Sequence, residues 1–374
     1  MLLYVVTGFG RFLSMRERIG ILTSGGDCPG LNAVIRAVVK SATKRGWETL
    51  GFLGGFEGLL EPERYRTLDY KEMDALLFVG GTILGTSNKG RFAAKIGHGE
   101  ARRIPEDILQ QAKANFHKLG LRALICVGGD GSLSIAQQLF EAGIPVVGVP
   151  KTIDNDLEAT AMTFGFDSAV ACATEALDRL RTTAQSHDRA MVLEVMGRYA
   201  GWIAVHAGIS GGGDVILIPE IPFSYEAVCA KIADREREGK HFTLLVVAEG
   251  AREKGKDYVT AGHSGDNREA RLGGIGAVVA SEVQKRSGKE SRVCVLGHLQ
   301  RGGPPTSFDR LLCTRFGARA VQLVAEEGYG CMVASHPPDI VGVKLTDAIG
   351  RLRTVPPDGD IVQTARALGV CFGD

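Results

Sequence analysis

The chain has 374 residues, of which 44 are basic and 43 are acidic, and its formal net charge is +1. This balance argues against nucleic-acid binding, and no apolar run is long enough for a membrane helix, so neither nucleic acid nor membrane is an expected partner. With 44% apolar and 23% charged residues, the composition is typical of a soluble globular protein, and the length predicts about two domains. The eight cysteines form no Cys-x-x-Cys pair, which favours a reducing compartment, the cytoplasm.

Residues 1–14 precede a second methionine, Met15, and lack the basic start and long apolar core of a secretory signal. We interpret them as an extension that is disordered or not translated. Regular patterning begins at Arg18.

From there, strands and helices alternate. An apolar run at residues 19–22 is followed by a glycine-rich loop at 23–30, and apolar residues then repeat at helical spacing from Leu31. The same unit recurs at 123–127, with a loop at 128–132 and a helix that carries Phe140 on its apolar face. The other predicted elements are strands at 146–149, 191–195, 243–248 and 293–296 and an amphipathic helix at 168–184.

Strands that alternate with helices and are apolar throughout indicate parallel sheets covered on both sides, hence an α/β protein. Ligands of such sheets bind at the carboxyl ends of strands, where the glycine-rich loops of this chain lie.

Gly-Gly-Asp occurs three times, at 25–27, 128–130 and 212–214. A glycine-rich loop between a strand and a helix offers N–H groups that favour phosphate, although each motif can also be a plain turn. The chain lacks the P-loop and Gly-x-Gly-x-x-Gly fingerprints.

Residues 150–156, Pro-Lys-Thr-Ile-Asp-Asn-Asp, form a dense polar cluster after a predicted strand. One carboxylate could act as a general base while a neighbour, here or in Asp130, binds Mg²⁺. The alternative is a capped surface turn.

Four arginines and one histidine lie near predicted strand ends, and guanidinium groups suit phosphate oxygens. Each arginine alone could equally form a surface salt bridge. They are Arg189, Arg198, Arg292, Arg301 and His298.

The residues alone therefore indicate an α/β enzyme that acts on two phosphorylated small molecules with a divalent ion. The rival class is a non-enzymatic sensor of nucleotide or sugar phosphate. Asp154 discriminates between them, because a sensor has no use for a base beside a phosphate cradle.

Five motifs, at 21–32, 128–132, 150–156, 196–198 and 297–303, resemble the 6-phosphofructokinases in order and spacing. The resemblance implies two doubly wound, Rossmann-like parallel-sheet domains with helices on both faces. It places residues 15–165 plus 300–350 in a nucleotide-binding domain and 166–299 plus 351–374 in a sugar-phosphate-binding domain.

The resemblance also implies roles. Asp154 matches the base that activates the 1-hydroxyl of fructose 6-phosphate towards the γ-phosphate of ATP, the co-substrate, and Asp130 matches the Mg²⁺ ligand. The phosphate cradle matches Gly26, Gly129, Gly131 and Ser132, with Arg198, Thr152 and Gly26 as further catalytic positions. Other substrate positions are Ile153, Met196, Gly197, Glu249, His298, Leu299, Gln300 and Arg301.

Arg189 and Arg292 match arginines that family members reach across a subunit interface, so the resemblance implies a homo-oligomer, dimer or tetramer, with shared active sites. The nucleotide-contacting cation aligns with Arg91, next to Phe92, and Lys89 is the alternative.

The phosphoryl donor depends on two positions. Lys151 resembles the pyrophosphate-using branch, whereas Gly131 lacks the aspartate that blocks ATP there, so we expect an ATP-dependent enzyme and keep a pyrophosphate-dependent one as the alternative. In the family's bacterial effector pocket, Glu238 stands where a lysine is usual, among the similar charges Arg36, Lys40, Arg181, Asp214 and Lys240.

Overall fold

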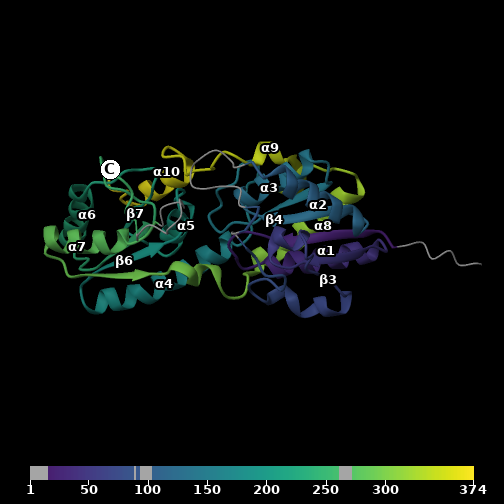
Figure 1. Ribbon diagram of the computed structural model, residues 1–374. Coiled ribbons are helices and arrows are strands. Elements are labelled where there is room, and N and C mark those ends of the chain that lie inside the picture. Colours follow the sequence, from purple (N-terminus) through teal and green to yellow (C-terminus); the bar gives the residue numbers. More distant parts are fainter. Residues whose placement is uncertain (1–15, 88–89, 93–102, 261–271) are drawn as a thin grey trace, which may run out of the picture.

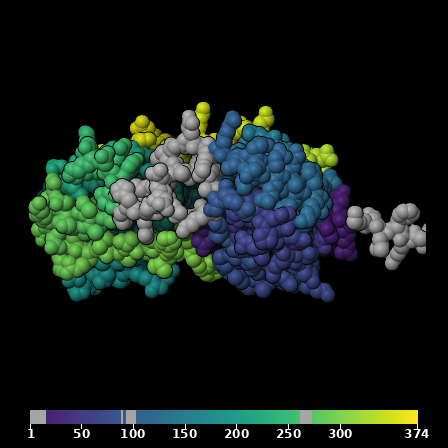
Figure 2. Space-filling view, in the orientation of Figure 1, coloured from purple at the N-terminus to yellow at the C-terminus, as the bar shows by residue number. Residues whose placement is uncertain are grey.

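The computed structural model describes residues 16–87, 90–92, 103–260 and 272–374. These residues form two lobes side by side, each built around one sheet (Figure 1). Early residues make up most of one lobe, and the last part of the chain runs along both lobes (Figure 2).

The larger sheet has seven strands in the order β11-β10-β5-β4-β1-β2-β3. Its five inner strands are parallel, while the edge strands β3 and β11 pair antiparallel with their neighbours. The strands are β1 Arg18–Thr23, β2 Glu48–Phe52, β3 Tyr65–Thr67, β4 Leu121–Gly128, β5 Val146–Pro150, β10 Cys331–His336 and β11 Asp339–Lys344.

The smaller sheet is entirely parallel, in the order β7-β8-β6-β9. Its strands are β6 Ala190–Val195, β7 Val215–Leu217, β8 Thr243–Ala248 and β9 Ser291–Val295.

Helices connect the strands, and 3-10 helices lie in the loops. The helices are α1 Leu31–Lys44, α2 Glu106–Lys118, α3 Asp130–Glu141, α4 Phe166–Ser186, α5 Trp202–Ser210, α6 Tyr225–Arg237, α7 Ile275–Ser287, α8 Ser307–Ala325, α9 Leu345–Ala348 and α10 Asp360–Ala367, with η1 Gly55–Leu59, η2 Tyr70–Phe78 and η3 Gly297–Arg301.

Strand β4 shows why helices cover both faces of the larger sheet. Successive side chains of a strand point to opposite faces, so Ile125 and Val127 join a core with α1 and α8, whereas Leu124 and Cys126 join one with α2 and α3. The smaller sheet is likewise covered by α4 and α5 on one face and by α6 and α7 on the other. The α/β class and the two-sided cover are confirmed.

The predicted strands and helices lie within a few residues of those observed, but two expectations about burial are wrong. The run at 293–296 is not a buried strand: β9 ends at Val295, and Val293 and Val295 are 40% and 54% exposed because β9 is the edge of its sheet. Phe140, expected on a buried helix face, is half-exposed.

The strands divide between the sheets in the order expected of the two domains, but the domain boundaries stay a prediction. The chain passes from the larger lobe to the smaller one near α4, returns after η3, and crosses again after α9 (Figure 1). Among the helices described, none is both long and apolar enough to cross a membrane.

Candidate active site

The first glycine loop follows β1, and its carbonyls accept hydrogen bonds from two cationic side chains. Gly25 has a φ of 83°, which glycine adopts without strain. The Nζ of Lys151 donates to the Gly26 carbonyl, and the Nη1 of Arg301 donates to the Asp27 carbonyl at 3.1 Å. A Cβ on Gly26 would lie 2.5 Å from that Nη1, so glycine is what lets Arg301 reach the loop.

The second glycine loop joins β4 to α3. Gly129 is the N-cap of α3, and because it has no side chain it leaves the first N–H groups of the helix without a side-chain cap. Ser132 places its Oγ 3.3 Å from where a Cβ on Gly25 would lie, so the two glycine loops are neighbours. The Oδ1 of Asp130 accepts a hydrogen bond from the Gly350 N–H at 2.8 Å.

The polar loop after β5 presents the candidate base. Asp154 is only 5% exposed, and its N–H donates to the Thr152 hydroxyl at 3.1 Å, while Ile153 packs into the core. Asn155, at a φ of 51°, accepts from the Thr163 N–H through its side chain and so fixes the turn. Within the described chain, the Oδ1 of Asp154 has no hydrogen-bond partner. A buried carboxylate oxygen without a partner is costly, so this oxygen is available to a ligand.

Further carboxylates lie close to Asp154. Burial and, to a smaller extent, the charge of Asp154 raise the pKa of Glu249 to about 7, although the backbone N–H of Arg198 donates to Glu249 at 3.1 Å and favours its ionised form. Burial and the charge of Asp154 also raise the pKa of Asp156, against the charge of Arg198. This crowding of negative charge around Arg198 suits a site where a proton is moved.

The loop after β6 is joined to η3 by one buried amide. Gln300 is 1% exposed, and its Oε1 accepts from the Met196 N–H at 2.8 Å. This bond brings the Met196–Arg198 loop, with Gly197 at a φ of 142°, against the helix that carries His298 and Arg301. Leu299, in the same helix, is 69% exposed and lies outside this arrangement.

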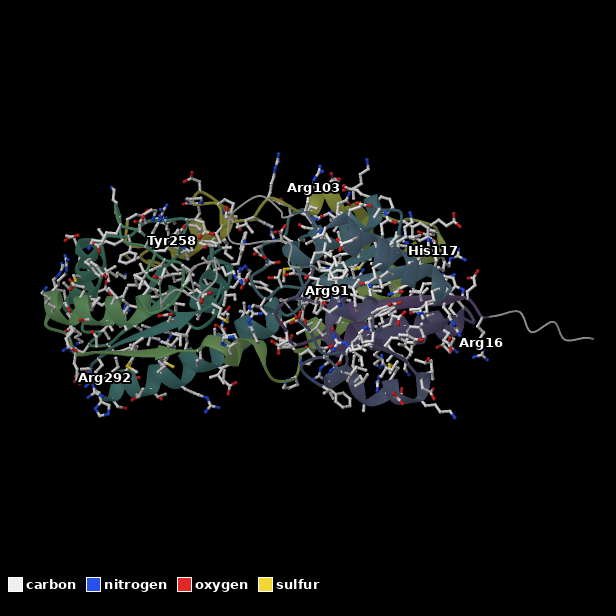
Figure 3. The ribbon with its side chains drawn as sticks, in the orientation of Figure 1. Arg16, Arg91, Arg103, His117, Tyr258 and Arg292 are labelled. Atoms are coloured by element: carbon white, nitrogen blue, oxygen red, sulfur yellow. The ribbon has the colours of Figure 1, made fainter. Side chains whose placement is uncertain are left out.

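Arg189 and Arg292 lie at the amino ends of strands in the smaller sheet. Arg189 directly precedes β6 and Arg292 is the second residue of β9, so both mark amino ends, whereas the loops above follow carboxyl ends. Both arginines pair with Glu290, Arg189 at 2.9 Å, and Figure 3 shows Arg292 at the outer end of its lobe, far from Arg91.

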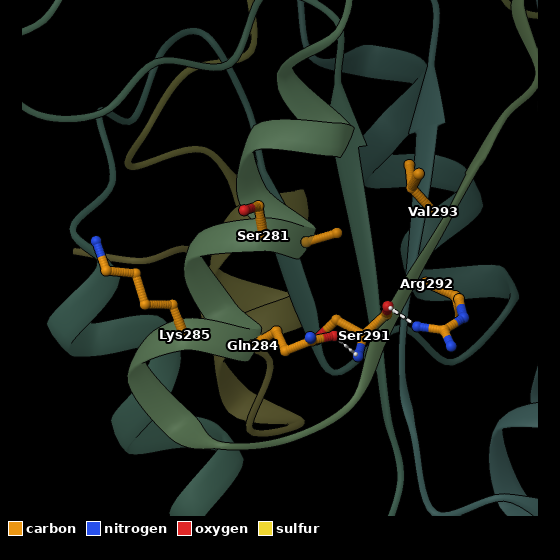
Figure 4. Close-up of a pocket in the computed structure, with 7 residues that line it drawn as sticks. Ser281, Gln284, Lys285, Ser291, Arg292 and Val293 are labelled. Atoms are coloured by element: carbon orange, nitrogen blue, oxygen red, sulfur yellow. Dashed lines mark hydrogen bonds between the residues drawn. The ribbon is translucent and has the colours of Figure 1, made fainter.

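Arg292 also borders an open hollow between α7 and β9, with Ser281, Lys285 and Ser291 among its lining residues (Figure 4). The structure therefore does not bring Arg189 and Arg292 to the Asp154 of their own chain.

Comparison with known proteins identifies this arrangement. A family model described as phosphofructokinase matches residues 18–324. The chain belongs to the phosphofructokinase family.

Its relatives include both donor types. An ATP-dependent 6-phosphofructokinase of Chloroflexus aurantiacus is 55% identical over 363 residues, which are 96% of this chain and 99% of the relative. A pyrophosphate–fructose 6-phosphate 1-phosphotransferase of Amycolatopsis methanolica is 51% identical over 343 residues, 91% of this chain and 97% of the relative.

The fold has a solved counterpart in the crystal structure of Pichia pastoris phosphofructokinase in the T-state. That structure matches with a TM-score of 0.77 and 31% identity over 89% of this chain, although the match covers only 35% of the longer yeast chain. The resemblance found in the sequence is thereby confirmed.

The structure describes the surroundings of Arg91, the cation expected to contact the nucleotide. The Nε of Arg91 pairs with Glu57 at 3.1 Å, and Phe92 is buried against Phe56 with ring centroids 5.6 Å apart. The alternative cation, Lys89, lies outside the described residues.

Sequence reasoning missed Asp309, which holds the start of α4. Its carboxylate is fully buried and accepts from the N–H groups of Gly165 and Ser168, at 3.0 and 2.9 Å, and from the Ser168 hydroxyl at 2.6 Å. Burial raises the pKa of Asp309 to about 6. No local pattern marks this role, because the partners are more than a hundred residues away in sequence.

Asp130 fits the requirements of Mg²⁺ only together with a substrate. In the part of the chain that the structure describes, no three His, Cys, Asp or Glu side chains gather as a metal site. Mg²⁺ in kinases is usually held by one or two carboxylates plus substrate phosphates, and Asp130, next to a glycine-rich loop of the kind that suits phosphate, fits that description.

In the expected effector pocket, three of the four cations already have partners within the chain. Lys40 pairs with Asp74, Arg181 donates to the carbonyls of Gly211 and Gly212, and Lys240 pairs with Glu238 at 2.9 Å. The third Gly-Gly-Asp is a turn in which Asp214 pairs with Arg235 at 2.6 Å.

Proposed function

We propose that this phosphofructokinase transfers the γ-phosphate of MgATP to the 1-hydroxyl of fructose 6-phosphate, giving fructose 1,6-bisphosphate and ADP. The observation that carries the proposal is Asp154, whose buried, unpartnered oxygen lies on the loop next to two glycine-rich loops. A nucleotide or sugar-phosphate sensor would gain nothing from such a group, and the relatives named above are phosphotransferases.

In this reaction Asp154 accepts the proton of the 1-hydroxyl while the oxygen of that hydroxyl forms a bond to the γ-phosphorus. The bond between that phosphorus and the bridging oxygen breaks, and ADP leaves. Thr152 fixes the loop through its hydroxyl, and Arg198, whose positive charge acts on the neighbouring Asp156, neutralises the transferring group in this proposal.

Backbone N–H groups hold the nucleotide phosphates in this proposal. They come from Gly26 in the first loop and from Gly129, Gly131 and Ser132 at the start of α3, where the helix dipole favours anions. Asp130 holds Mg²⁺, which supplies charge neutralisation to the phosphates when bound.

The sugar phosphate is held by η3 and the loop after β6. His298 and Arg301 bind the 6-phosphate, and Met196, Gly197 and Glu249 border the sugar. Gln300 supports both groups by joining the two segments.

The donor is ATP in this proposal because Gly131 leaves space for the nucleotide and Lys151 does not exclude it. A Cβ on Gly131 would meet no heavy atom within 4 Å among the described residues, so this position leaves space for the nucleotide. Lys151 is 4% exposed and engaged with the Gly26 carbonyl, so its ammonium supports the loop. The deciding experiment offers fructose 6-phosphate with ATP or pyrophosphate in parallel, and faster turnover of pyrophosphate at matched concentrations contradicts the assignment.

The proposed active unit is a homo-oligomer in which Arg189 and Arg292 complete the 6-phosphate site of a neighbouring subunit. Their position at the far edge of the smaller sheet supports this, because they cannot serve the site of their own chain. Exposed apolar side chains that an interface would cover include Phe78, Val293, Val295, Leu299, Phe308 and Leu311.

Shared sites predict complementation. Asp154→Asn subunits mixed with Arg292→Ala subunits, each inactive alone, should recover roughly a quarter of wild-type activity if dimers assort at random, since one of the two sites in each hybrid is intact. Turnover is measured after subunit exchange, verified with labelled chains. Exchange without any recovered turnover would contradict shared sites.

The effector pocket predicts a weak response to ADP and phosphoenolpyruvate. Glu238 adds negative charge and forms an ion pair with Lys240, so the pocket has little positive charge left to bind a phosphate. Initial rates should change by less than about fivefold with either effector, below the usual range of allosteric coupling, and Glu238→Lys should increase the response. A larger response that Arg36→Ala abolishes would show this expectation to be wrong.

All eight cysteines are free thiols, which supports the proposal of a reducing compartment, the cytoplasm.

A further inference from the structure

The segment 350–355, here called the strap, joins α9 on the larger lobe to α10 on the smaller one (Figure 1). At its start the Gly350 N–H donates to the Oδ1 of Asp130 at 2.8 Å. At its end the Val355 N–H donates to Glu220 at 2.8 Å, and the same carboxylate accepts from the Gly201 N–H at 2.9 Å. The strap is therefore tied to the start of α3 in one lobe and to the start of α5 in the other.

Arg353, in the middle of the strap, forms hydrogen bonds and a cation–π contact with residues of both lobes. Its N–H donates to the Asp156 carbonyl at 2.9 Å, and its Nη1 donates to the Ala161 carbonyl at 2.9 Å. Its carbonyl accepts from the Trp202 Nε1 at 2.8 Å, and its guanidinium lies over the Trp202 ring, 4.6 Å from the centroid.

These partners belong to a loop and a helix with different proposed parts in the reaction. Asp156 lies two residues after Asp154, and Ala161 lies further along the same loop. Trp202 begins α5, four residues after Arg198. One side chain thus contacts both the loop of the proposed base and the helix that follows the proposed phosphate-neutralising arginine.

The chemistry of arginine suits this position. A planar guanidinium can lie flat on an indole ring while its edge donates to a carbonyl, whereas the ammonium of lysine is a point charge without that plane. Reacting groups held on separate loops lose rate steeply when their spacing changes by about 1 Å.

We propose that Arg353 is a positioning residue that sets the spacing between the Asp154 loop and the Met196–Arg198 loop through its contact with Trp202. The proposal rests on the proposed roles of Asp154 and Arg198. Arg353 acts through these loops and needs no contact with either substrate.

The test compares Arg353→Met with Arg351→Met. Methionine keeps an unbranched side chain but loses the guanidinium, and Arg351 is an exposed arginine on the same strap, so it controls for charge and composition. Arg353→Met should lower kcat about tenfold to a hundredfold, while the KM for fructose 6-phosphate stays within about threefold because His298 and Arg301 lie on η3. Arg353→Lys should recover part of the lost kcat, and Arg351→Met should match the wild type.

A second readout does not depend on turnover. The chain has two tryptophans, so Trp47→Phe leaves Trp202 as the sole reporter of its contact with Arg353. Adding Arg353→Met to this background should shift the emission of Trp202, whereas adding Arg351→Met should not. Unchanged emission with Arg353→Met would overturn the proposal, because the contact would then be absent in solution.

The outcomes separate this inference from the proposed function. A wild-type protein that does not phosphorylate fructose 6-phosphate contradicts the function itself. A functional wild type with equal kcat in Arg353→Met and Arg351→Met overturns the positioning role alone. Should Arg353→Met fail to fold, Trp202→Phe decides, since it removes the Nε1 donor to the Arg353 carbonyl and shrinks the ring on which the guanidinium lies. A several-fold lower kcat supports the proposal, and wild-type kcat overturns it.

Discussion

Asp154→Asn is expected to lower kcat by roughly 10²–10⁴, the usual range for the loss of a general base. An amide cannot accept the proton of the 1-hydroxyl, although it fills the same space and keeps the loop geometry. The KM for fructose 6-phosphate should change far less, because the proposed phosphate anchors are His298 and Arg301, with arginines of a neighbouring subunit. Steady-state kinetics with both substrates varied measures the two effects separately.

The variant should stay folded, because it removes one charge from a crowded group. The charge of Asp154 raises the pKa of both Asp156 and Glu249, so its loss eases their ionisation. Asp178→Asn, on an exposed part of α4, makes the same chemical change away from the site and should leave kcat unaltered. A folded Asp154→Asn protein with wild-type kcat would exclude Asp154 as the base.

Gly131→Asp is expected to lower kcat/KM for ATP by about a hundredfold or more. A carboxylate within about 4 Å of a nucleotide phosphate costs roughly 3–4 kcal/mol at the effective dielectric near a protein surface, and the side chain also fills the space left open there. The protein itself should tolerate the change. A Cβ at this position meets no heavy atom within 4 Å in the described chain, and the helix dipole stabilises an acidic residue in the first turn of α3.

Gly131→Asn separates bulk from charge, since it has nearly the same shape without the negative charge. It should lose less kcat/KM for ATP than Gly131→Asp does. Pyrophosphate, which lacks the α-phosphate and nucleoside, should be less affected than ATP by either change. Equal kcat/KM for ATP in Gly131→Asp and the wild type would mean that this position does not select the donor.

Much of this site could be predicted because its residues follow strongly patterned strands. The run at 146–149 is wholly apolar, and the change to Lys151, Thr152 and Asp154 marks its end without reference to the rest of the chain. The edge strands β3 and β11 carried no such signal: β3 is exposed along its length and β11 is only partly buried, so neither shows a clear apolar pattern.

Asp309 and Arg353 could not be predicted for a different reason. Their partners are backbone groups or side chains brought close only by the crossing of the chain between lobes. A backbone carbonyl or N–H leaves no trace in the residue type that carries it, so the sequence shows neither contact. The same holds for Asp130, where the aspartate was predicted but its bond to the Gly350 N–H was not.

Strand β9 has a consequence for how the molecule is made. It is the outer strand of the smaller sheet, with Val293 and Val295 exposed, and the strands beside it are complete before it is synthesised. An uncovered edge with apolar side chains invites pairing with any extended chain nearby. In the proposed homo-oligomer, a newly made subunit is therefore at risk of aggregation until it assembles with an identical chain. Synthesis of several identical chains on one messenger would shorten that interval.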